Sequence, residues 1–182
     1  MPRLAPLDMD QLTPAQQGVV DKMLAGPRGG MRGPFESLLV RPELCDRVQH
    51  LGAYCRFDTT LERDVAELAI ILTGKHWQAQ FEFWAHARLA REVGLPEEVI
   101  EAVRTGAPIE TDNASYRAVH AFVTEYFATN RVGDATYEQA RSALGEEGVV
   151  DLVGLVGYYG LVSFTLNVFE VGLPEGEAEL LD

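Results

Sequence analysis

Two titratable side chains stand one helical turn apart in a mostly apolar stretch, "QAQFEFWAH", which ends at His86. Positions four apart lie on one face of a helix, so the carboxylate of Glu82 can contact the imidazole of His86. Such a pair is either a local ion pair or half of a proton relay. The flanking aromatic residues leave little room for a solvated face, and this favours the relay; they are Phe81, Phe83 and Trp84.

A third titratable residue, Glu67, lies in the preceding apolar segment "LERDVAELAIIL". If this segment and the one with Glu82 and His86 form antiparallel helices, all three groups can meet. Burial raises the pKa of a carboxyl group and a neighbouring imidazolium lowers it, so such a cluster can hold its protons near neutral pH. Proton shuttling needs this environment. His76, near the turn between the helices, is an additional candidate; a capping or surface role is the alternative.

A metal site is the main rival interpretation of these residues. Two carboxylates together with His76 and His86 form a plausible ligand set. No HExxH or similarly compact motif supports it, so we expect no metal. His50 and His120 have no visible partners in the sequence and are expected to be structural or exposed.

The elements that position these residues are predicted to be helices throughout, because apolar residues recur at helical spacing and no alternating strand pattern is present. Thr13 is a suitable N-cap before Pro14, and Gly26, Gly74 and Gly94 are suitable stops. The predicted helices cover residues 14–25, 42–58, 60–74, 75–94, 97–105, 115–130, 136–144 and 147–169.

The segment "GPRGGMRGPF" is too rich in Gly and Pro for regular structure, and its glycines match neither the phosphate-loop nor the dinucleotide-binding spacing. We interpret it as a mobile loop, which is either an active-site lid or a surface connection. One domain is expected for 182 residues. Within it, residues 1–34 form an N-terminal helix with this loop, and residues 35–182 form the main helical body.

The two halves of the main body resemble each other. "LERDVAELAIIL" and a later "EVGLP" are echoed by "GEEGVVDLVGLV" and a second "EVGLP". Each half is expected to end a helix pair in the same way. Counted back from the shared ending, Gly160 and Phe164 stand in the second half where Glu82 and His86 stand in the first. The fold class is therefore an all-α bundle with two pseudo-repeated halves, of which one is functional.

Composition restricts the partners. The net charge of −13 argues against nucleic acid and anionic lipid as partners. The N-terminus lacks the continuous apolar region of a signal peptide, which predicts a cytoplasmic protein. Residues 149–169 are apolar enough to resemble a membrane span, but the internal Asp151 and Asn167 and the missing basic flank favour a buried helix. Cys45 and Cys55 fit neither a zinc-ligand nor a CxxC spacing and are expected to be reduced packing residues.

Four segments together resemble the carboxymuconolactone decarboxylase and alkyl hydroperoxidase D (AhpD) family. They are "GPFESLLVRPEL", "ERDVAELAI", "FEFWAHARLA" with "VGLP", and "LVGYYGLVSFTLNVFEV". The peroxidase branch of this family has a glutamate, then a CxxC pair, then a histidine. Glu67 and His86 match the glutamate and the histidine, but Ala79 and Glu82 replace the two cysteines. Thiol peroxidase activity is therefore not expected, because that chemistry requires a thiolate.

The remaining pattern is similar to the decarboxylase branch, which implies a cofactor-independent lyase acting on a small carboxylated lactone or a related conjugated acid. Loss of carbon dioxide leaves a dienolate, and Glu82 and His86 would supply its proton while Glu67 sets the protonation state of the imidazole. The lactone carbonyl can itself accept the electrons, so no organic cofactor is expected. The resemblance also implies a homo-oligomer, a trimer or hexamer.

Three questions stay open at this point. The substrate carboxylate would need an arginine, and helical phase does not choose among Arg56, Arg63, Arg88 and Arg91. The same relay would serve a hydratase, dehydratase or isomerase. A non-catalytic binding protein that has kept the fold is the third reading, and it predicts that the relay residues are exposed or distant from each other, with no pocket around them.

Overall fold

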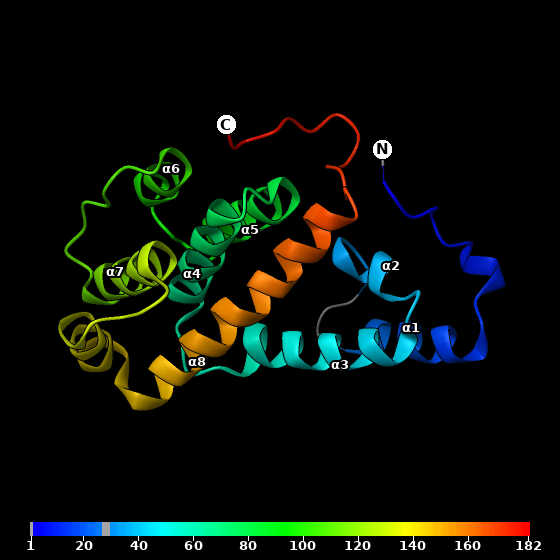
Figure 1. The fold of residues 1–182 in the computed structure, drawn as a ribbon, viewed down its shortest axis with the longest axis horizontal. Coiled ribbons are helices and arrows are strands. Elements are labelled where there is room, and N and C mark those ends of the chain that lie inside the picture. The colour runs from blue at the N-terminus through cyan, green and yellow to red at the C-terminus, as the bar shows by residue number, and fades with distance from the viewer. Residues whose placement is uncertain (1, 27–29) are drawn as a thin grey trace.

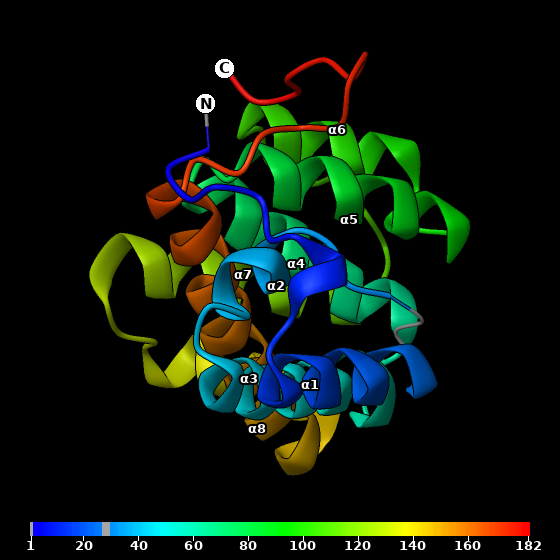
Figure 2. The same ribbon diagram turned by 90° about the vertical axis from the view of Figure 1, so that its right-hand side faces the viewer.

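The computed structural model describes residues 2–26 and 30–182, and the regular elements in these ranges are all helical. Figures 1 and 2 show them as a bundle with α5 and α6 at one end and α1 and α3 at the other. In chain order the elements are η1 (Met9–Gln11), α1 (Pro14–Ala25), α2 (Pro34–Leu38), α3 (Pro42–Ala53), a π-helical turn (Tyr54–Asp58, here the π-turn), α4 (Arg63–His76), α5 (Gln80–Glu92), α6 (Glu97–Thr105), α7 (Ala114–Thr129) and α8 (Asp134–Val168).

Helix α4 is the centre of the bundle because it packs against α5, α7 and α8. Nine of its 14 residues are buried, which accounts for its nearly continuous apolar sequence. Helix α8 crosses the molecule diagonally in front of α4 (Figure 1). Any polar side chain in the middle of α4 is therefore removed from water.

Most predicted helices are confirmed. Helix α1 begins with the expected Thr13 cap, which forms a reciprocal capping box with Gln16, and α6 has the predicted bounds. The predicted break between the last two helices is a kink inside α8, where Gly145 has the non-helical angles φ 76° and ψ 172°.

Two local predictions are wrong. Helix α4 does not stop at Gly74 but continues to His76, and α5 begins only at Gln80. Gly74 is buried where α4 meets α5, and an added Cβ would lie 3.4 Å from the backbone nitrogen of Phe83. Its function is close helix packing. The Gly/Pro segment also contains regular structure, because Pro34 opens the short helix α2 at a position that needs no N–H donor. Residues 27–29 of the predicted loop lie outside the described residues.

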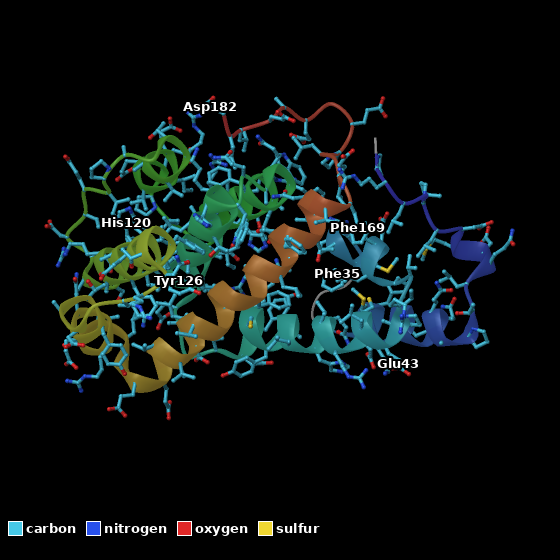
Figure 3. All side chains as sticks on the ribbon, viewed as in Figure 1. Phe35, Glu43, His120, Tyr126, Phe169 and Asp182 are labelled. Carbon is cyan, nitrogen blue, oxygen red and sulfur yellow. The ribbon has the colours of Figure 1, made fainter. Side chains whose placement is uncertain are left out.

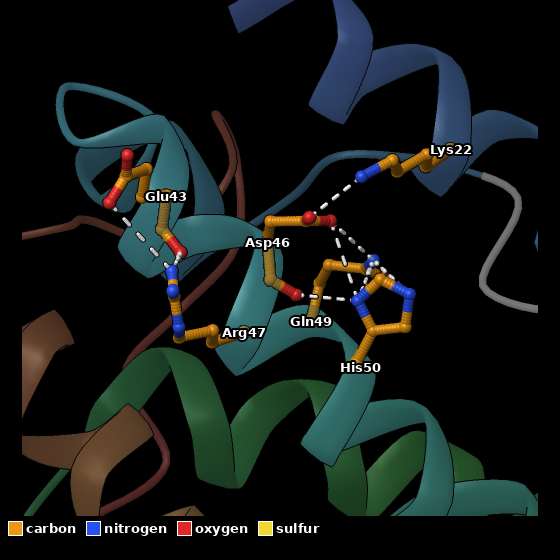
Figure 4. A network of polar contacts seen from close by, with 6 residues as sticks. All are labelled: Lys22, Glu43, Asp46, Arg47, Gln49 and His50. Carbon is orange, nitrogen blue, oxygen red and sulfur yellow. Dashed lines mark hydrogen bonds and ion pairs between the residues drawn. The ribbon is translucent and has the colours of Figure 1, made fainter. Parts of the chain in front are cut away.

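A polar network joins α1 to α3 at the far end of the bundle (Figure 4). Lys22 Nζ lies 2.7 Å from a carboxylate oxygen of Asp46, and this contact lowers the pKa of Asp46. Asp46 also accepts a hydrogen bond from Gln49 at 3.2 Å, and its backbone carbonyl lies 2.7 Å from His50 Nδ1. His50 is thus a surface residue with local partners.

Helix α8 is long and apolar enough to cross a membrane by length and composition, a test that the core helix of a soluble protein also passes. In its most apolar window, with a mean hydropathy of 1.7, 61% of the residues are buried in the bundle. The remaining face forms an exposed stripe, here called the α8 stripe, which consists of Val150, Val153, Gly154, Gly157, Leu161 and Phe164. An added Cβ at Gly154 or Gly157 would meet nothing within 4 Å, so these two glycines do not serve packing within this chain.

The two "EVGLP" sequences end their helices in different registers, which corrects the expectation of identical endings. In the first half Gly94 has positive φ (91°) and the amide of Leu95 bonds to Ala90. In the second half Glu170 has positive φ (52°) and the amide of Val171 bonds to Leu166. The same cap geometry thus falls on Glu170 instead of Gly172, because Val171 is the apolar residue that packs back on the core.

Candidate active site

Helices α4 and α5 present the three predicted relay residues to one another. The two helices are joined by a tight turn in which Gln78 has positive φ (50°), and they pack side by side (Figure 1). The buried positions of α5 recur at helical spacing and define its inner face: Glu82, Phe83, His86, Ala87 and Ala90. The pair at positions 82 and 86 therefore points into the bundle, toward Glu67 on α4.

The imidazole of His86 bridges two carboxylates. Its Nδ1 lies 2.6 Å from Glu67 Oε2, and its Nε2 lies 3.0 Å from Glu82 Oε1. The exposed fractions of the side chains are 8% for His86, 1% for Glu67 and 5% for Glu82. With a carboxylate on each side, both ring nitrogens carry hydrogen and donate, so the imidazolium is the form that this geometry accommodates.

The protonation of His86 follows from two opposing effects. Burial by itself lowers the pKa of the imidazole, but the charges of Glu67 and Glu82 and their hydrogen bonds raise it, and the balance is a pKa of about 9. His86 is therefore protonated at neutral pH. A buried proton donor with a high pKa, held in place on both sides, can deliver a proton to a neighbouring carbanion.

A cavity of about 390 Å³ opens beside this relay. Glu82 and His86 line it, whereas Glu67 lies behind the imidazole. The apolar part of the wall includes Phe35 of α2, Phe81 of α5 and Val162 of α8. The volume suits a small ligand, so the cavity can bring such a ligand to the proton on the pair.

Two tyrosines of α8, Tyr158 and Tyr159, complete the wall next to the relay. The ring of Tyr159 stands nearly perpendicular to the imidazole of His86, at a centroid distance of 5.0 Å and an angle of 78°. Burial and the two nearby carboxylates keep the pKa of Tyr159 well above 10. Its hydroxyl is thus a neutral hydrogen-bond donor at physiological pH.

Three arginines line the cavity, namely Arg32, Arg56 and Arg88. Arg88 also lies over the ring of Trp84, at 5.2 Å. Of the other two arginines considered from sequence, Arg91 makes two hydrogen bonds with Glu97, and Arg63 does not line the cavity. The local surplus of guanidinium groups contrasts with the net charge of −13 of the whole chain and favours an anionic ligand.

His76 does not join the relay. Its ring is stacked on Phe127 of α7 at 3.9 Å, and it lines a different, more open hollow that also includes His120. Figure 3 shows His120 on the α7 side of the bundle, and Phe35, which lines the relay cavity, on the opposite side of α8. A metal site built from His76 and His86 is incompatible with this arrangement. Among residues 2–26 and 30–182 no group of three or more His, Cys, Asp and Glu is arranged to hold a metal ion.

Sequence reasoning missed Arg32, Tyr158 and Tyr159. Arg32 stands in the Gly/Pro segment, where no periodicity indicates its direction. The two tyrosines belong to an apolar helix in which aromatic residues are ordinarily packing residues. One feature of the sequence could have indicated them: "VGYYG" places two tyrosine hydroxyls between glycines in a helix that was predicted to be buried.

The fold is an AhpD-like all-α bundle, and a carboxylate–histidine pair, Glu82 and His86, lines its cavity. A protein of unknown function from Agrobacterium tumefaciens, described in connection with the antioxidant defence protein AhpD, has a TM-score of 0.66 and 19% identity over 79% of this chain and 99% of its own. A peroxidase-related protein from Ralstonia eutropha with an alkylhydroperoxidase AhpD core has a TM-score of 0.77 and 16% identity over 96% of this chain and 93% of its own. At these identities the similarity concerns the fold. No protein-family model and no curated protein matches the chain.

Proposed function

We propose that the protein is a cofactor-independent lyase that removes carbon dioxide from a small carboxylated lactone or a related conjugated acid. The observation that carries this proposal is the buried imidazolium of His86, held between two carboxylates at the wall of a cavity. The binding-protein reading predicted exposed or separated relay residues without a pocket. These residues are instead buried, in mutual contact and next to a cavity, which supports an enzyme.

In the proposed reaction the bond between the carboxylate carbon and the substrate breaks, and its electron pair moves into the conjugated lactone carbonyl. Carbon dioxide leaves, and the resulting dienolate takes a proton on carbon from the Glu82 and His86 pair. Water later returns one proton to the pair, so the reaction consumes one proton for each carbon dioxide released. Glu67 does not reach the cavity and acts as a positioning residue for the imidazolium.

We do not propose a thiol peroxidase, although both similar structures carry antioxidant or peroxidase descriptions. Cys45 and Cys55 are buried, and neither lines the relay cavity. Burial and the charge of Asp151 raise the pKa of Cys55 to about 11. A thiol in this state holds its proton at neutral pH and is a poor nucleophile.

The proposal is tested by following decarboxylation of carboxymuconolactone by ultraviolet absorbance. We expect turnover by the parent protein and a loss of about 10²- to 10⁴-fold in kcat for Glu82→Gln and for His86→Gln, the range associated with a positioned proton donor. The matched control is His76→Ala. His76 is the last residue of α4 and does not line the relay cavity, so kcat is expected to be unchanged. Treatment with a chelator is expected to leave the parent rate unchanged.

A folded parent protein that leaves carboxymuconolactone intact would reject the decarboxylase assignment. The same variants would then be screened for proton exchange and for water addition with conjugated enoates. Exchange that depends on Glu82 and His86 would indicate a hydratase, dehydratase or isomerase, which uses the same relay.

A further inference from the structure

Arg56 is the unusual member of the arginines around the cavity. It is half-buried, and its Nε atom is fully buried without a hydrogen-bond partner among the described residues. A buried donor without an acceptor carries the full cost of its lost hydration. By contrast, Arg91, Arg104 and Arg141 are each paired with a glutamate of their own surroundings.

The direction of Arg56 is set by the π-turn. Asp151 of α8 holds this turn on both sides. It accepts a hydrogen bond from the hydroxyl of Tyr54, the first residue of the turn, at 2.5 Å. It accepts two more from the backbone N–H and the hydroxyl of Thr60, two residues beyond the turn, at 2.7 and 2.9 Å. π-Helical turns are rare, and those that occur are frequently found at functional sites. Here the turn holds Arg56 at the cavity wall.

The neighbours of Arg56 place its charge close to the relay. The guanidinium lies 5.2 Å from the centre of the Phe57 ring, a contact that leaves its hydrogen-bond donors unused. Its charge acts on the buried Tyr159, whose ring contacts His86. Arg56, Glu82 and His86 therefore line the same cavity, and Tyr159 is affected by both Arg56 and His86.

We propose that Arg56 is the carboxylate-binding residue of this cavity. The proposal rests on the proposed function for its substrate and adds the residue that orients it. The carboxylate it holds is not the one that is lost, because a guanidinium would stabilise the charge that must disappear as carbon dioxide leaves and would slow the reaction. Arg56 instead anchors a second acidic group and so directs the reacting carbon toward Glu82 and His86.

The test uses cis,cis-muconate, a six-carbon dicarboxylate, as the probe, and measures its dissociation constant with the full-length protein by isothermal titration calorimetry. For Arg56→Gln we expect affinity to fall by about 10- to 100-fold, the loss expected for a charge-assisted hydrogen-bond pair. Arg56→Lys is expected to recover part of it. Binding of the dimethyl ester of muconate, which has no charge, is expected to be the same in the parent protein and both variants.

Arg63→Gln is the matched control, because Arg63 also lies over the Phe57 ring, at 5.8 Å, but does not line the cavity. Circular dichroism and thermal unfolding establish that each variant is folded. Equal muconate affinity in the parent protein and Arg56→Gln, an equal loss in Arg63→Gln, or no muconate binding by the parent at millimolar concentration would each overturn the proposal.

This test is separate from that of the reaction. If the protein has no decarboxylase activity but binds muconate in an Arg56-dependent manner, the proposed lyase function is refuted and the proposed role of Arg56 in carboxylate binding is supported. If the protein decarboxylates carboxymuconolactone, we expect Arg56→Gln to raise KM. An unchanged KM would refute the proposed role of Arg56 and leave the lyase function supported.

Discussion

At the scale of single residues, the two carboxylates that contact His86 differ in their position relative to the cavity. Glu67 makes the shorter contact, 2.6 Å, and lies entirely outside the cavity. It can therefore stabilise the imidazolium without meeting a ligand. This separates the residue that sets the charge from Glu82, which lies at the cavity wall.

The first prediction concerns the titration of His86. Because the two carboxylates raise its pKa to about 9, its ring proton resonances should titrate near pH 9 in an NMR experiment, and Glu67→Gln should lower the midpoint by about one unit or more. His120 is the internal control, since its pKa is lowered by burial and it lies away from Glu67. A His86 midpoint that Glu67→Gln leaves in place would contradict the assigned cause.

The second prediction is the pH dependence that follows from the same group. A pKa raised from 6.5 to about 9 contributes stability that is complete below about pH 6.5 and is lost as the pH rises through 9, at most about 3 kcal/mol. The free energy of unfolding from urea titrations should therefore decrease between pH 7 and pH 10. The proposed decarboxylase rate should fall over the same range, because deprotonation removes the donor. A rate that rises through pH 9 would exclude the imidazolium as the acid.

The core of the relay could be predicted from sequence because it depends on local geometry. Glu82 and His86 are one helical turn apart, and Glu67 is on the neighbouring helix of a short antiparallel pair. Tyr159 could not be predicted, because it is brought to His86 by the packing of α8, and helical phase within α8 says nothing about which helix it faces.

At the scale of elements, features that depend on local sequence could be predicted, and features that depend on packing between distant helices could not. Helix bounds followed capping residues such as Thr13. The π-turn did not, since "YCRFD" continues the helical pattern of α3, and its contacts with Asp151 come from α8, far along the chain. The register of the second half was also misleading. Counted back twelve residues from the positive-φ residue in each half, Tyr158 (170 − 12) takes the place of Glu82 (94 − 12), and both line the cavity.

The third prediction belongs to α2. Gly33 precedes this helix with φ 63° and ψ −119°, a conformation that side chains disfavour, and an added Cβ would lie 2.7 Å from the Phe81 ring. We expect Gly33→Ala to reduce the free energy of unfolding by about 1–3 kcal/mol and to weaken ligand binding, because Phe81 lines the cavity. Gly18→Ala in α1, where the added Cβ meets nothing within 4 Å, is the control and should not destabilise. Urea titration measures both, and equal stability of the two variants would show that Gly33 is not under this constraint.

At the scale of the whole molecule, the α8 stripe is an exposed apolar surface on the part of α8 whose other faces are buried in the bundle. Val150 is 71% exposed and Phe164 is 60% exposed. Contiguous exposed apolar residues on a soluble protein commonly mark an interface. The bare glycines Gly154 and Gly157 between them would allow another backbone to approach closely.

The fourth prediction is that the protein forms a homo-oligomer through this stripe, in line with the trimer or hexamer that the family resemblance implies. Light scattering coupled to size-exclusion chromatography should give a multiple of 20.1 kDa, and the double variant Val150→Glu with Phe164→Glu should give the monomer mass. Substituting the exposed Leu24 of α1 with Glu provides the control. A monomeric parent protein would refute the expectation, and an oligomer that survives the double variant would place the interface elsewhere.

The origin of the cavity wall in α8 has a consequence for biosynthesis. The relay is encoded between residues 67 and 86, but Asp151, which fastens the π-turn, and Tyr159 belong to α8 and are synthesised later. A nascent chain that has completed α5 carries all three titratable groups without α8, the helix that packs against α4 and α5. Truncated products that lack α8 would therefore have the relay residues without the cavity wall that Tyr158, Tyr159 and Val162 supply.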